Sequence, residues 1–354
     1  MRMPDVFPFV TAILPCRNEE KFIAGCLDSI ISSDYPRDRL EVLVIDGMSE
    51  DGTREILAGY TERHKFVRML ENRKNTTPCA FNLGIRNARG SIIIIMGMHA
   101  SYASDYISNC VRYLDKYGVD NVGGVMVTVP RENTLKGKAI AQALSHKFGV
   151  GNSTFRTGAG KPLFVDTVFG GCYKKDVFEK VGMFNEALSR NQDIDLNHRL
   201  KKAGGRILLA PKITCTYYAR SDMKSFLINN WNNGFYTLVS IGESHITPVS
   251  ARHLVPLVFA TSLIASAGLS IFFKAIAWMF LAIVCSYALA ALYFSLRISL
   301  SRKDWRFLFV MPPVFAMLHA SHGLGALYGV IHLLTSRRFW TRKVLNTWKS
   351  PVRD

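Results

Sequence analysis

The chain has 354 residues, 49% of them hydrophobic and 20% charged, and its 44 Lys and Arg against 27 Asp and Glu give a formal charge of +17. So apolar a chain buries enough surface to offset the entropy lost on ordering, which excludes an intrinsically disordered protein. Its length exceeds that of one ordinary domain, so we expect two units. A mean hydropathy of +0.12 beside 20% charged residues indicates a polar unit joined to a strongly apolar one.

The first residues predict a cytosolic location for the N-terminal part. Residues 1–8 contain an aspartate and two prolines and lack the apolar stretch of a signal peptide, so we expect the first 250 residues to stay on the cytosolic side. Seven cysteines are scattered along the chain without a C-x-x-C pair or a metal-ligand spacing. This pattern is typical of reduced thiols in a protein core rather than of a disulfide framework.

Strand and helix patterns alternate over residues 9–250. Short apolar runs predict strands over residues 10–14, 41–45, 67–70, 91–96 and 122–129. Helical periodicity predicts helices over residues 20–31, 52–64 and 78–88. This alternation indicates an α/β fold with a parallel sheet wound in βαβ units, in which ligands bind beyond the carboxyl ends of the strands.

Polar side chains follow the first two predicted strands. Asn18 and Glu19 come after the first strand, and Asp46, Ser49 and Asp51 come after the second. Any one of Asn18, Ser49 and Asp51 is explained by capping of the helix that follows it. Together, however, the two clusters place hydrogen-bond acceptors at neighbouring strand ends, which suits the N–H groups and hydroxyls of a nucleobase and a ribose.

The C-terminal third is strongly apolar. Residues 253–273 and 275–296 contain no Lys, Arg, Asp or Glu, and roughly 20 apolar residues suffice to cross a bilayer core. Neither run shows the polar stripe of a soluble-core helix, so both are predicted to span a membrane. A third uncharged stretch, residues 307–336, carries Pro312, Pro313 and several glycines. It is compatible with a kinked span, a re-entrant hairpin or an interfacial helix.

Basic residues flank these apolar segments, in clusters at residues 297–306 and 337–353. Such clusters normally mark the cytosolic face of a membrane and attract anionic lipid. The positive-inside rule therefore favours two full spans, with residues 307–336 re-entering or lying along the cytosolic face. Because the charge flanks the spans rather than forming a stripe with aromatic side chains, nucleic acid is not an expected partner.

Four segments carry a family resemblance, in order over about 200 residues: ILPCRNEE, VLVIDGMSEDGT, NTTPCAFNLGIRNARGSIIII and VFGGCYKKDVFEKVGMFNEALSRNQDIDLNHRLKKAGG. Their succession resembles the motifs of family 2 glycosyltransferases, which have the Rossmann-like GT-A fold. The phrases DGMS, FGVGNSTFR and RNQDIDLN, followed by an apolar tail, are similar to the membrane-bound succinoglycan glucosyltransferase subgroup. Such enzymes transfer a hexose from a nucleotide-activated sugar, with inversion, to a lipid-linked or growing saccharide.

The resemblance implies a donor site made by three segments of the chain. The family's first nucleotide-contacting loop, the loop whose aspartate faces the uracil, and the Asn-x-Gly helix near the donor diphosphate all have counterparts here. Asp46 is the counterpart of the uracil-facing aspartate. The residues implied to bind the nucleotide sugar are Pro15, Glu19, Asp46, Ser49, Asp51, Asn82 and Gly84.

Asp193, within Asn191-Gln192-Asp193, matches the general base of the family. Inverting transfer needs a carboxylate that takes the acceptor hydroxyl's proton as the hydroxyl attacks the anomeric carbon, and such a base contributes roughly 10²- to 10⁴-fold. An acid in the first turn of a helix also stabilises the helix dipole, so Asp193 has a structural explanation as well. Trp231 and Gly234 resemble the acceptor-side segment near the membrane surface.

The chain departs from the family at the metal-binding motif. Where relatives carry Asp-x-Asp, or Asp-x-His in this subgroup, the chain has Met96-Gly97-Met98-His99. Mg²⁺ prefers oxygen ligands, and Gly97 offers none from a side chain. His99 is left to bind a softer Mn²⁺, to hydrogen-bond the diphosphate directly, or to cap the residues that follow. A divalent cation, Mg²⁺ or Mn²⁺, therefore stays an open expectation.

Residues 222–240 place apolar and aromatic side chains at helical spacing just before the first predicted span. Aromatic-rich amphipathic helices in this position often lie in the bilayer interface, where this one would bring lipid-carried acceptor hydroxyls within reach of Asp193. The alternative is a helix packed on the catalytic domain. We favour the interface because so few residues separate this segment from the span.

These patterns predict four parts: a cytosolic GT-A domain (residues 1–220), an interfacial segment (221–250), membrane helices (251–336) and a basic tail (337–354). The resemblance implies a multi-pass protein of the cell (inner) membrane that transfers a hexose, such as glucose, from a UDP-sugar. The implied acceptor is a polyprenyl-linked saccharide in exopolysaccharide or cell-surface glycan synthesis, at the lipid bilayer.

Two alternatives stay open. A polyprenyl phosphate acceptor is already an anion, so the enzyme would need no base and Asp193 would be dispensable. The missing aspartate at Gly97 favours a different alternative, a non-catalytic scaffold that binds nucleotide. The retained Asp46, Asp51 and Asp193 argue against the scaffold.

Overall fold

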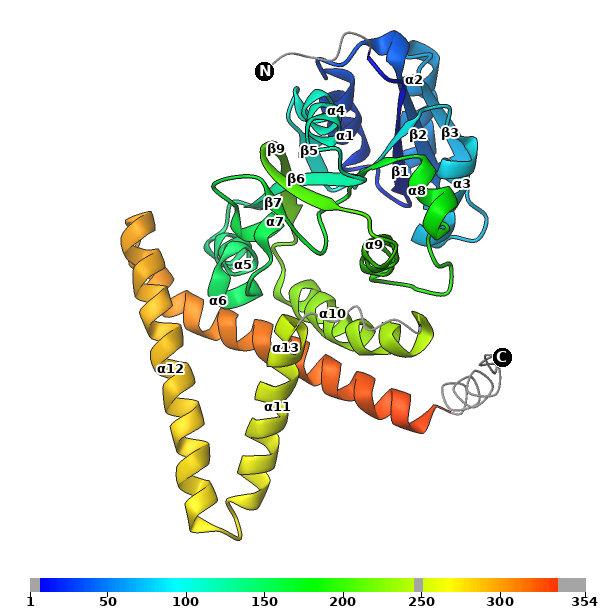
Figure 1. Ribbon diagram of the computed structural model, residues 1–354. Coiled ribbons are helices and arrows are strands. Elements are labelled where there is room, and N and C mark those ends of the chain that lie inside the picture. The colour runs from blue at the N-terminus through cyan, green and yellow to red at the C-terminus, as the bar shows by residue number, and fades with distance from the viewer. Residues whose placement is uncertain (1–6, 245–250, 337–354) are drawn as a thin grey trace, which may run out of the picture. The chain divides into compact units, whose positions relative to one another are not determined.

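The computed structural model describes residues 7–244 and 251–336 (Figure 1). The chain divides into two compact units, which interleave along the sequence. The first unit comprises Met1–Arg131 and Leu144–Ala219, and the second comprises Glu132–Ala143 and Arg220–Asp354. A short piece from the middle of the N-terminal half therefore belongs with the C-terminal helices, which the sequence patterns did not predict.

The first unit is built around one mixed sheet (Figure 1). Over the described residues it has nine strands in the order β3-β2-β1-β4-β8-β6-β9-β5, with β7 paired to β9. Strands β1 to β4 run parallel, and β8 runs antiparallel between β4 and β6. The strands are β1 (Val10–Cys16), β2 (Leu40–Asp46), β3 (Val67–Glu71), β4 (Ile92–Ile95), β5 (Ala100–Tyr102), β6 (Asn121–Pro130), β7 (Leu163–Phe164), β8 (Cys172–Lys174) and β9 (Ile207–Ala219).

Helices cover both faces of this sheet, and the apolar side chains form one core cluster on each face. Because the central strands are covered on both sides, most of their residues are apolar, and every residue of β2 is buried, including Glu41 and Asp46. The predicted α/β class is thereby confirmed. The helices of the first unit are α1 (Ile23–Ile31), α2 (Thr53–Arg63), α3 (Thr77–Asn87), α4 (Tyr106–Lys116), α6 (Lys147–Val150), α7 (Thr154–Thr157), α8 (Asp176–Val181) and α9 (Gln192–Lys202), with a 3₁₀ turn at Arg37–Arg39.

The strand register places the predicted site loops side by side. Cys16 at the end of β1 pairs with Asp46 at the end of β2, and Ile13 pairs with Ile95 at the end of β4. The segments that follow β1, β2 and β4 therefore leave the sheet at the same edge. Helix α1 begins at Ile23 rather than at the predicted Glu20, and the amide of Glu20 bonds the Asp51 carboxylate at 3.2 Å.

The cysteines behave as small core residues. All seven are free, and all are buried except Cys285, which is exposed on a helix of the second unit. The prediction that they are small core residues is confirmed for these six.

The second unit is helical. Its helices are α5 (Leu135–Ser145, which the unit boundary divides near its end), α10 (Met223–Ser244), α11 (Ala251–Leu269), α12 (Lys274–Arg302) and α13 (Arg306–Thr335). Two polar contacts tie α5 to the others: the amide of Glu132 donates to Ser221 Oγ at 2.9 Å, and Arg302 Nη2 donates to Gln142 Oε1 at 2.7 Å. The helix predicted over residues 222–240 is confirmed as α10.

Helices α10 and α13 pack with their backbones in close approach, because glycines line their contact. A methyl group at Gly234 would collide with the backbone oxygen of His322, and one at Gly325 would collide with that of Trp231. A methyl group at Gly329 would come within 2.8 Å of the oxygen of Phe235. Small residues at i and i+4 are a common means of bringing two apolar helices together. Gly234, predicted to lie on the acceptor side, thus has a packing role.

We expect Gly234→Ala to destabilise the second unit by about 1–3 kcal/mol, the usual cost of inserting a methyl group where no space exists. Its control is Gly268→Ala in α11, where nothing lies within 4 Å of the added methyl. Alanine favours helix over glycine, so the control should melt at the same temperature or slightly higher. Thermal unfolding in detergent compares the two, and a Gly234 variant that melts like the control would contradict this packing role.

The apolar helices differ in part from the predicted spans. Over the described residues, α12 and α13 are long and apolar enough to cross a membrane, with mean hydropathies of 2.2 and 1.4. Only 6% of the apolar window of α12 is buried within the protein. The predicted span over residues 253–273 is wrong in extent: α11 ends at Leu269, a turn follows at residues 270–272, and its apolar stretch is shorter.

The third apolar stretch forms one uninterrupted helix, α13, that passes through Pro312 and Pro313. These prolines lie near its start, where they remove only the hydrogen bonds to two carbonyl groups of the first turns. A hairpin within residues 307–336 is therefore excluded, which leaves a span or a helix along the membrane surface. Figure 1 shows α13 beside α10, crossing α11 and α12. The predicted basic tail at 337–354 and residues 245–250 of the predicted interfacial segment lie outside the described residues.

Candidate functional site

Hydrogen bonds connect the loop that follows β1 to the loop that follows β2. The amide of Asn18 donates to Ser49 Oγ at 2.9 Å, and the amide of Glu50 donates to Asn18 Oδ1 at 2.9 Å. The amide of Glu19 donates to Thr53 Oγ1 at 2.7 Å. Asn18 has a positive φ of 54°, which asparagine tolerates better than most residues. The two predicted nucleotide loops are thus brought together as one polar surface at the edge of the sheet.

Asp46 is the centre of this surface and is fully buried. Its carboxylate accepts hydrogen bonds from Ser49 Oγ at 2.6 Å and from the Ser49 amide at 3.2 Å, and it pairs with Arg54 Nε at 3.1 Å. Both oxygens are therefore used within the protein. The predicted contact of Asp46 with a nucleobase stays a prediction, whereas its role in holding Ser49 and Arg54 is visible in the structure.

Asp51 caps helix α2. Its carboxylate accepts from the amide of Thr53 at 3.0 Å and from Thr53 Oγ1 at 2.5 Å, and it also accepts from the Glu20 amide. Desolvation pushes the pKa of Asp51 upward, but these hydrogen bonds outweigh it and lower the pKa below its ordinary value. The capping explanation is thus borne out for Asp51 and leaves its predicted contact with the donor a prediction.

Asn82 lies on α3 and holds a distant segment of the chain. Its side-chain nitrogen donates to Phe184 O at 2.9 Å and Glu186 Oε1 at 3.1 Å, and its oxygen accepts from the Phe184 amide at 2.9 Å. A hydrogen bond from Lys74 is the main cause that lowers the pKa of Glu186 to about 2. Gly84, on the same helix, lets α3 approach Ile13 of β1. Contact of Asn82 or Gly84 with a diphosphate stays a prediction.

His99 lies in a cluster of charged and aromatic side chains after β4. Its Nε2 is 3.2 Å from Glu19 Oε1, and its Nδ1 is 3.5 Å from Arg131 Nη2. The ring of Phe22 meets His99 edge to face at 4.8 Å, and the Arg131 guanidinium lies 4.1 Å from the Phe22 ring centroid. The structure therefore joins Glu19, predicted to contact nucleotide, with His99, the tentative metal ligand. Arg131 was missed, although it lies two residues beyond a predicted strand and directly follows β6.

The residues near Gly97 do not by themselves form a metal cage. Over the described residues, no group of three or more His, Cys, Asp or Glu side chains comes together. Glu19 and His99 offer one carboxylate and one imidazole, and Gly97 offers no side-chain ligand. Mg²⁺ is commonly held by one or two carboxylates together with substrate phosphates, so this donor set fits only a cation that a bound diphosphate completes.

The first turn of α9 presents two carboxylates with different environments. Asp195 is buried and pairs with Arg199, whose Nη2 and Nε lie 2.8 and 3.0 Å from its Oδ2. Arg199 is held in turn by the backbone oxygens of Val181 and Met183. Asp193 has no such ion pair within residues 7–244 and 251–336, and burial raises the pKa of its carboxyl although backbone amides oppose this. A carboxylate with raised proton affinity is what a general base requires.

Two further polar atoms near these segments are buried and have no hydrogen-bond partner among the described residues. They are Gln192 Oε1, next to the predicted base, and Arg156 Nη1, on α7. Both residues lie within phrases that carry the family resemblance, RNQDIDLN and FGVGNSTFR. Residue type alone gave no signal for either, because only the fold shows which polar atoms lack a partner.

Trp231 and Gly234 lie on α10, in the second unit. Trp231 is 37% exposed, and its ring centroid is 5.9 Å from that of Tyr328 on α13. A role of Trp231 or Gly234 toward an acceptor stays a prediction.

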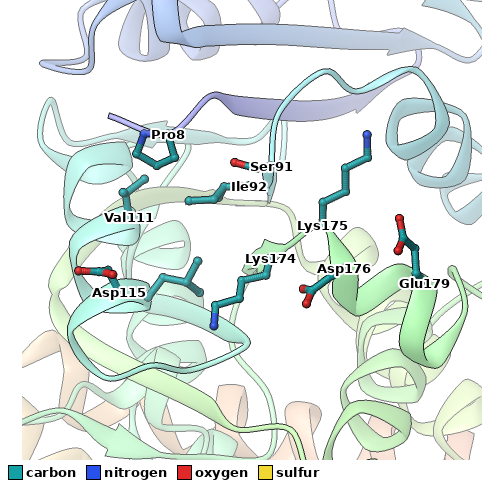
Figure 2. Close-up of a pocket in the computed structure, with 10 residues that line it drawn as sticks. Pro8, Ser91, Ile92, Val111, Asp115, Lys174, Lys175, Asp176 and Glu179 are labelled. Carbon is teal, nitrogen blue, oxygen red and sulfur yellow. The ribbon is translucent and has the colours of Figure 1, made fainter. Parts of the chain in front are cut away.

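A cavity of about 610 Å³ lies at the opposite edge of the sheet from the predicted site. Pro8 and Ser91, which precede β1 and β4, mark its position at the amino ends of these strands. Figure 2 shows its charged lining, to which Asp115, Lys174, Lys175, Asp176 and Glu179 contribute. Because ligands in sheets of this kind bind at the carboxyl ends, this cavity is not the predicted donor site.

The chain is similar in sequence to a glycosyltransferase family and to proteins of saccharide synthesis. Residues 11–182 match the family described as glycosyl transferase family 2. The dolichyl N-acetyl-alpha-D-glucosaminyl phosphate 3-beta-D-2,3-diacetamido-2,3-dideoxy-beta-D-glucuronosyltransferase of Methanococcus voltae is 31% identical over 227 residues, 62% of this chain and 70% of that protein. The succinoglycan biosynthesis protein ExoA of Rhizobium meliloti is 32% identical over 213 residues, 60% of this chain and 63% of that protein.

A solved structure shares the fold. The mannosyltransferase PcManGT from Pyrobaculum calidifontis, in complex with GDP-Man and Mn²⁺, aligns over 91% of this chain and 88% of its own, with a TM-score of 0.58 and 21% identity. The likeness supports the GT-A-type fold that the sequence motifs predict.

Proposed function

The chain belongs to glycosyltransferase family 2, and from this premise we propose that it transfers a hexose from a UDP-sugar, with inversion, to a saccharide carried on a polyprenyl diphosphate. The observation that carries the proposal is the contrast on α9. Asp195 is neutralised by Arg199, whereas Asp193 has a raised pKa and no comparable ion pair. The site therefore offers one carboxylate suited to accept a proton.

The chemistry follows from this placement. Asp193 takes the proton of the acceptor hydroxyl as its oxygen forms a bond to the anomeric carbon. The bond between that carbon and the donor phosphate breaks on the opposite face, and its electron pair leaves with UDP. The oxocarbenium character of the transition state makes the diphosphate a leaving group whose charge must be stabilised.

The lipid-linked acceptor is supported by the relatives and by the second unit. The Methanococcus protein is named for a dolichyl phosphate-linked acceptor, and the Rhizobium protein for succinoglycan biosynthesis. The apolar surfaces of α12 and α13 would keep this chain beside such a carrier. In this proposal Trp231 on α10 faces the acceptor, and Gly234 serves the acceptor side by holding α10 against α13. The donor contacts are Pro15, Glu19, Asp46, Ser49, Asp51, Asn82 and Gly84.

A screen of donors tests the function. UDP-, GDP- and dTDP-hexoses are offered to the full chain with a membrane lipid extract, and mass spectrometry identifies the glycolipid formed. We expect a UDP-hexose to extend a polyprenyl diphosphate saccharide. Formation of a sugar attached directly to polyprenyl phosphate would instead identify polyprenyl phosphate as the acceptor. Failure with every donor, despite UDP binding, would favour a non-catalytic scaffold.

We also propose a multi-pass location in the cell (inner) membrane, with the first unit in the cytosol and α11 and α12 inserted as a hairpin. The exposed apolar side chains Ile271, Phe272 and Phe273 form the tip of this hairpin. In a Cys285→Ser background, Ser270→Cys should react with a membrane-impermeant maleimide on intact cells, whereas Lys303→Cys should not. If Ser270→Cys is not labelled on intact cells, the hairpin of α11 and α12 does not cross the membrane.

The proposal includes a divalent cation only if the donor diphosphate completes the coordination of that cation. The Pyrobaculum enzyme was solved with Mn²⁺ and GDP-Man, and here Glu19 and His99 would be the protein ligands. Such an ion would stabilise charge on the leaving diphosphate. Every proton transfer assigned above is independent of it.

We expect Gly97→Asp to lower the Mn²⁺ or Mg²⁺ concentration that gives half-maximal activity. The change fits sterically, because a Cβ at position 97 would meet only Phe169 Cζ, at 3.6 Å. Gly97→Asn is the matched control, since it has the same size without the anionic oxygens that hard cations prefer. A metal titration of activity that is identical for both variants and the native chain would remove position 97 from the metal site.

A further inference from the structure

Arg156 is a partly buried cation without a counter-ion among the described residues. It lies on α7, in the first unit, and its Nη1 is buried with no hydrogen-bond partner among the described residues. Among those residues no carboxylate forms an ion pair with it, although eleven other pairs are formed. Burial lowers the pKa of Arg156, yet a guanidinium remains protonated in proteins. A partly buried positive charge, with one fully buried nitrogen, is therefore left without a partner in the described part of the chain.

A second orphaned donor lies close to this cation. Thr128 Oγ1 on β6 is also buried without a partner in the described part of the chain. Thr128 is the register partner of Tyr217 on β9, so both side chains lie on the same face of the sheet. Tyr217 also lies near enough to Arg156 to contribute to the electrostatic environment of its guanidinium. Arg156 and Thr128 are thus neighbours of one tyrosine.

This tyrosine connects both donors to the predicted reaction site. Its ring meets Phe169 at a centroid distance of 6.2 Å, and Phe169 lies 3.6 Å from the position of a side chain at Gly97. The adjacent Tyr218 donates its amide to the backbone oxygen of His99 at 3.0 Å. The orphaned donors therefore lie beside the segment where the chain lacks the family's acidic residue.

Burying an unpaired guanidinium is costly, and a buried hydroxyl without a partner adds to that cost. Native proteins leave few such groups, and each requires an explanation. Two donors and one positive charge, with no acceptor supplied by the chain, match an anionic ligand with several acceptor oxygens. Arginine suits phosphate in particular, because its planar fork can donate two parallel hydrogen bonds.

We propose that Arg156 and Thr128 bind a diphosphate, Arg156 with its guanidinium and Thr128 with its hydroxyl. The proposal rests on the proposed function, which supplies two diphosphates: that of the nucleotide donor and that of the lipid carrier. On the donor, Arg156 would stabilise the charge that develops on the leaving group, from the side where Gly97 provides no metal ligand.

The test measures binding and stability of the full chain in detergent. Calorimetry with UDP, uridine and inorganic diphosphate compares the native chain with Arg156→Met, Arg156→Lys and Thr128→Val. We expect Arg156→Met to weaken UDP and diphosphate binding roughly 10- to 100-fold, as expected for loss of a hydrogen bond between charged groups, and to leave uridine binding unchanged. Arg156→Lys should retain part of the affinity, and Thr128→Val should lose less than Arg156→Met.

The melting temperature separates binding from structure. Because the native groups lack partners, Arg156→Met and Thr128→Val should melt at the native temperature or above it. The control is Thr11→Val, whose hydroxyl donates to Glu41 Oε2 at 2.8 Å, and which should lower the melting temperature without changing UDP binding. A fall in melting temperature for the Arg156 and Thr128 variants, with unchanged diphosphate binding, would overturn the proposal.

Comparing the ligands shows which of the two diphosphates, that of the donor or that of the lipid carrier, Arg156 binds. Unchanged UDP binding together with a raised KM for the lipid acceptor would assign Arg156 to the carrier diphosphate. If the native chain binds inorganic diphosphate through Arg156 and does not bind UDP, the proposal that UDP-sugar is the donor is wrong, but the proposed diphosphate site is supported. If all variants bind UDP and inorganic diphosphate like the native chain and keep its acceptor KM, the site is refuted whatever the donor.

Discussion

Replacing Asp193 with asparagine should lower turnover by about 10²-fold or more while UDP affinity stays near that of the native chain. Asparagine keeps the size of the side chain and loses only the ability to take a proton. Burial disfavours the ionised carboxylate, so its removal should leave the melting temperature unchanged or raise it. Single-turnover kinetics, calorimetry and thermal unfolding measure the three quantities.

The pH dependence follows from the same shift. Because the pKa of Asp193 is raised in the folded state, protonation favours folding, and the native chain loses this stability as the pH rises through that raised pKa. The asparagine variant should not show this loss. Turnover of the native chain should rise over the same interval as the base becomes ionised, and the residual turnover of the variant should lack this rise.

The matched control is Asp195→Asn, two residues along the same helix. It removes the buried partner of Arg199, so we expect a loss of about 3–5 kcal/mol in stability. The two variants should therefore show opposite patterns, with Asp193→Asn inactive but stable. An Asp193 variant that unfolds would make this residue structural, and one with near-native turnover would favour a phosphate acceptor that needs no base.

Asp46→Ala should cost about 1–3 kcal/mol of stability, because it leaves the hydroxyl and amide of Ser49 without their buried acceptor, whereas the partly exposed Arg54 keeps Glu71. UDP affinity should fall as well, since Ser49 also holds the Asn18 amide and with it the first loop. Denaturant unfolding and calorimetry separate the two effects.

Glu71→Gln is the control for Asp46, because Arg54 also pairs with Glu71, whose side chain is 41% exposed. An exposed pair contributes at most about 1 kcal/mol, so this variant should be near native in stability and binding. If Asp46→Ala instead kept its stability and lost only UDP binding, the carboxylate would act on the base directly rather than through Ser49.

Sequence patterns predicted the parts of the fold that depend on neighbours in the chain. The apolar runs located β1 to β4 to within two residues at each end, and the parallel order implied that Glu19 and Asp46 would lie at one edge. Contacts between distant segments could not be inferred in this way. Asn82 bonds Phe184, more than 100 residues away, and no local pattern indicates this partner.

The same limit explains the differences in the second unit and in the site. Helicity and apolar composition were evident over residues 253–273, but no local pattern indicated that α11 ends at Leu269 and that a turn follows. Likewise, the sequence contains Arg156 without showing whether an acid pairs with it. Whether a polar group is satisfied is a property of the fold.

The glycine contact between α10 and α13 has a consequence for exchanging parts between relatives. The two helices are far apart in the sequence, yet their backbones fit only as a pair, since side chains at Gly234 or Gly325 would collide with the facing helix. A chimera that imports α10 alone would carry a surface shaped for a different neighbour. Grafting an acceptor preference from another enzyme should therefore succeed only when both helices are transplanted together, which makes them one module for recombination.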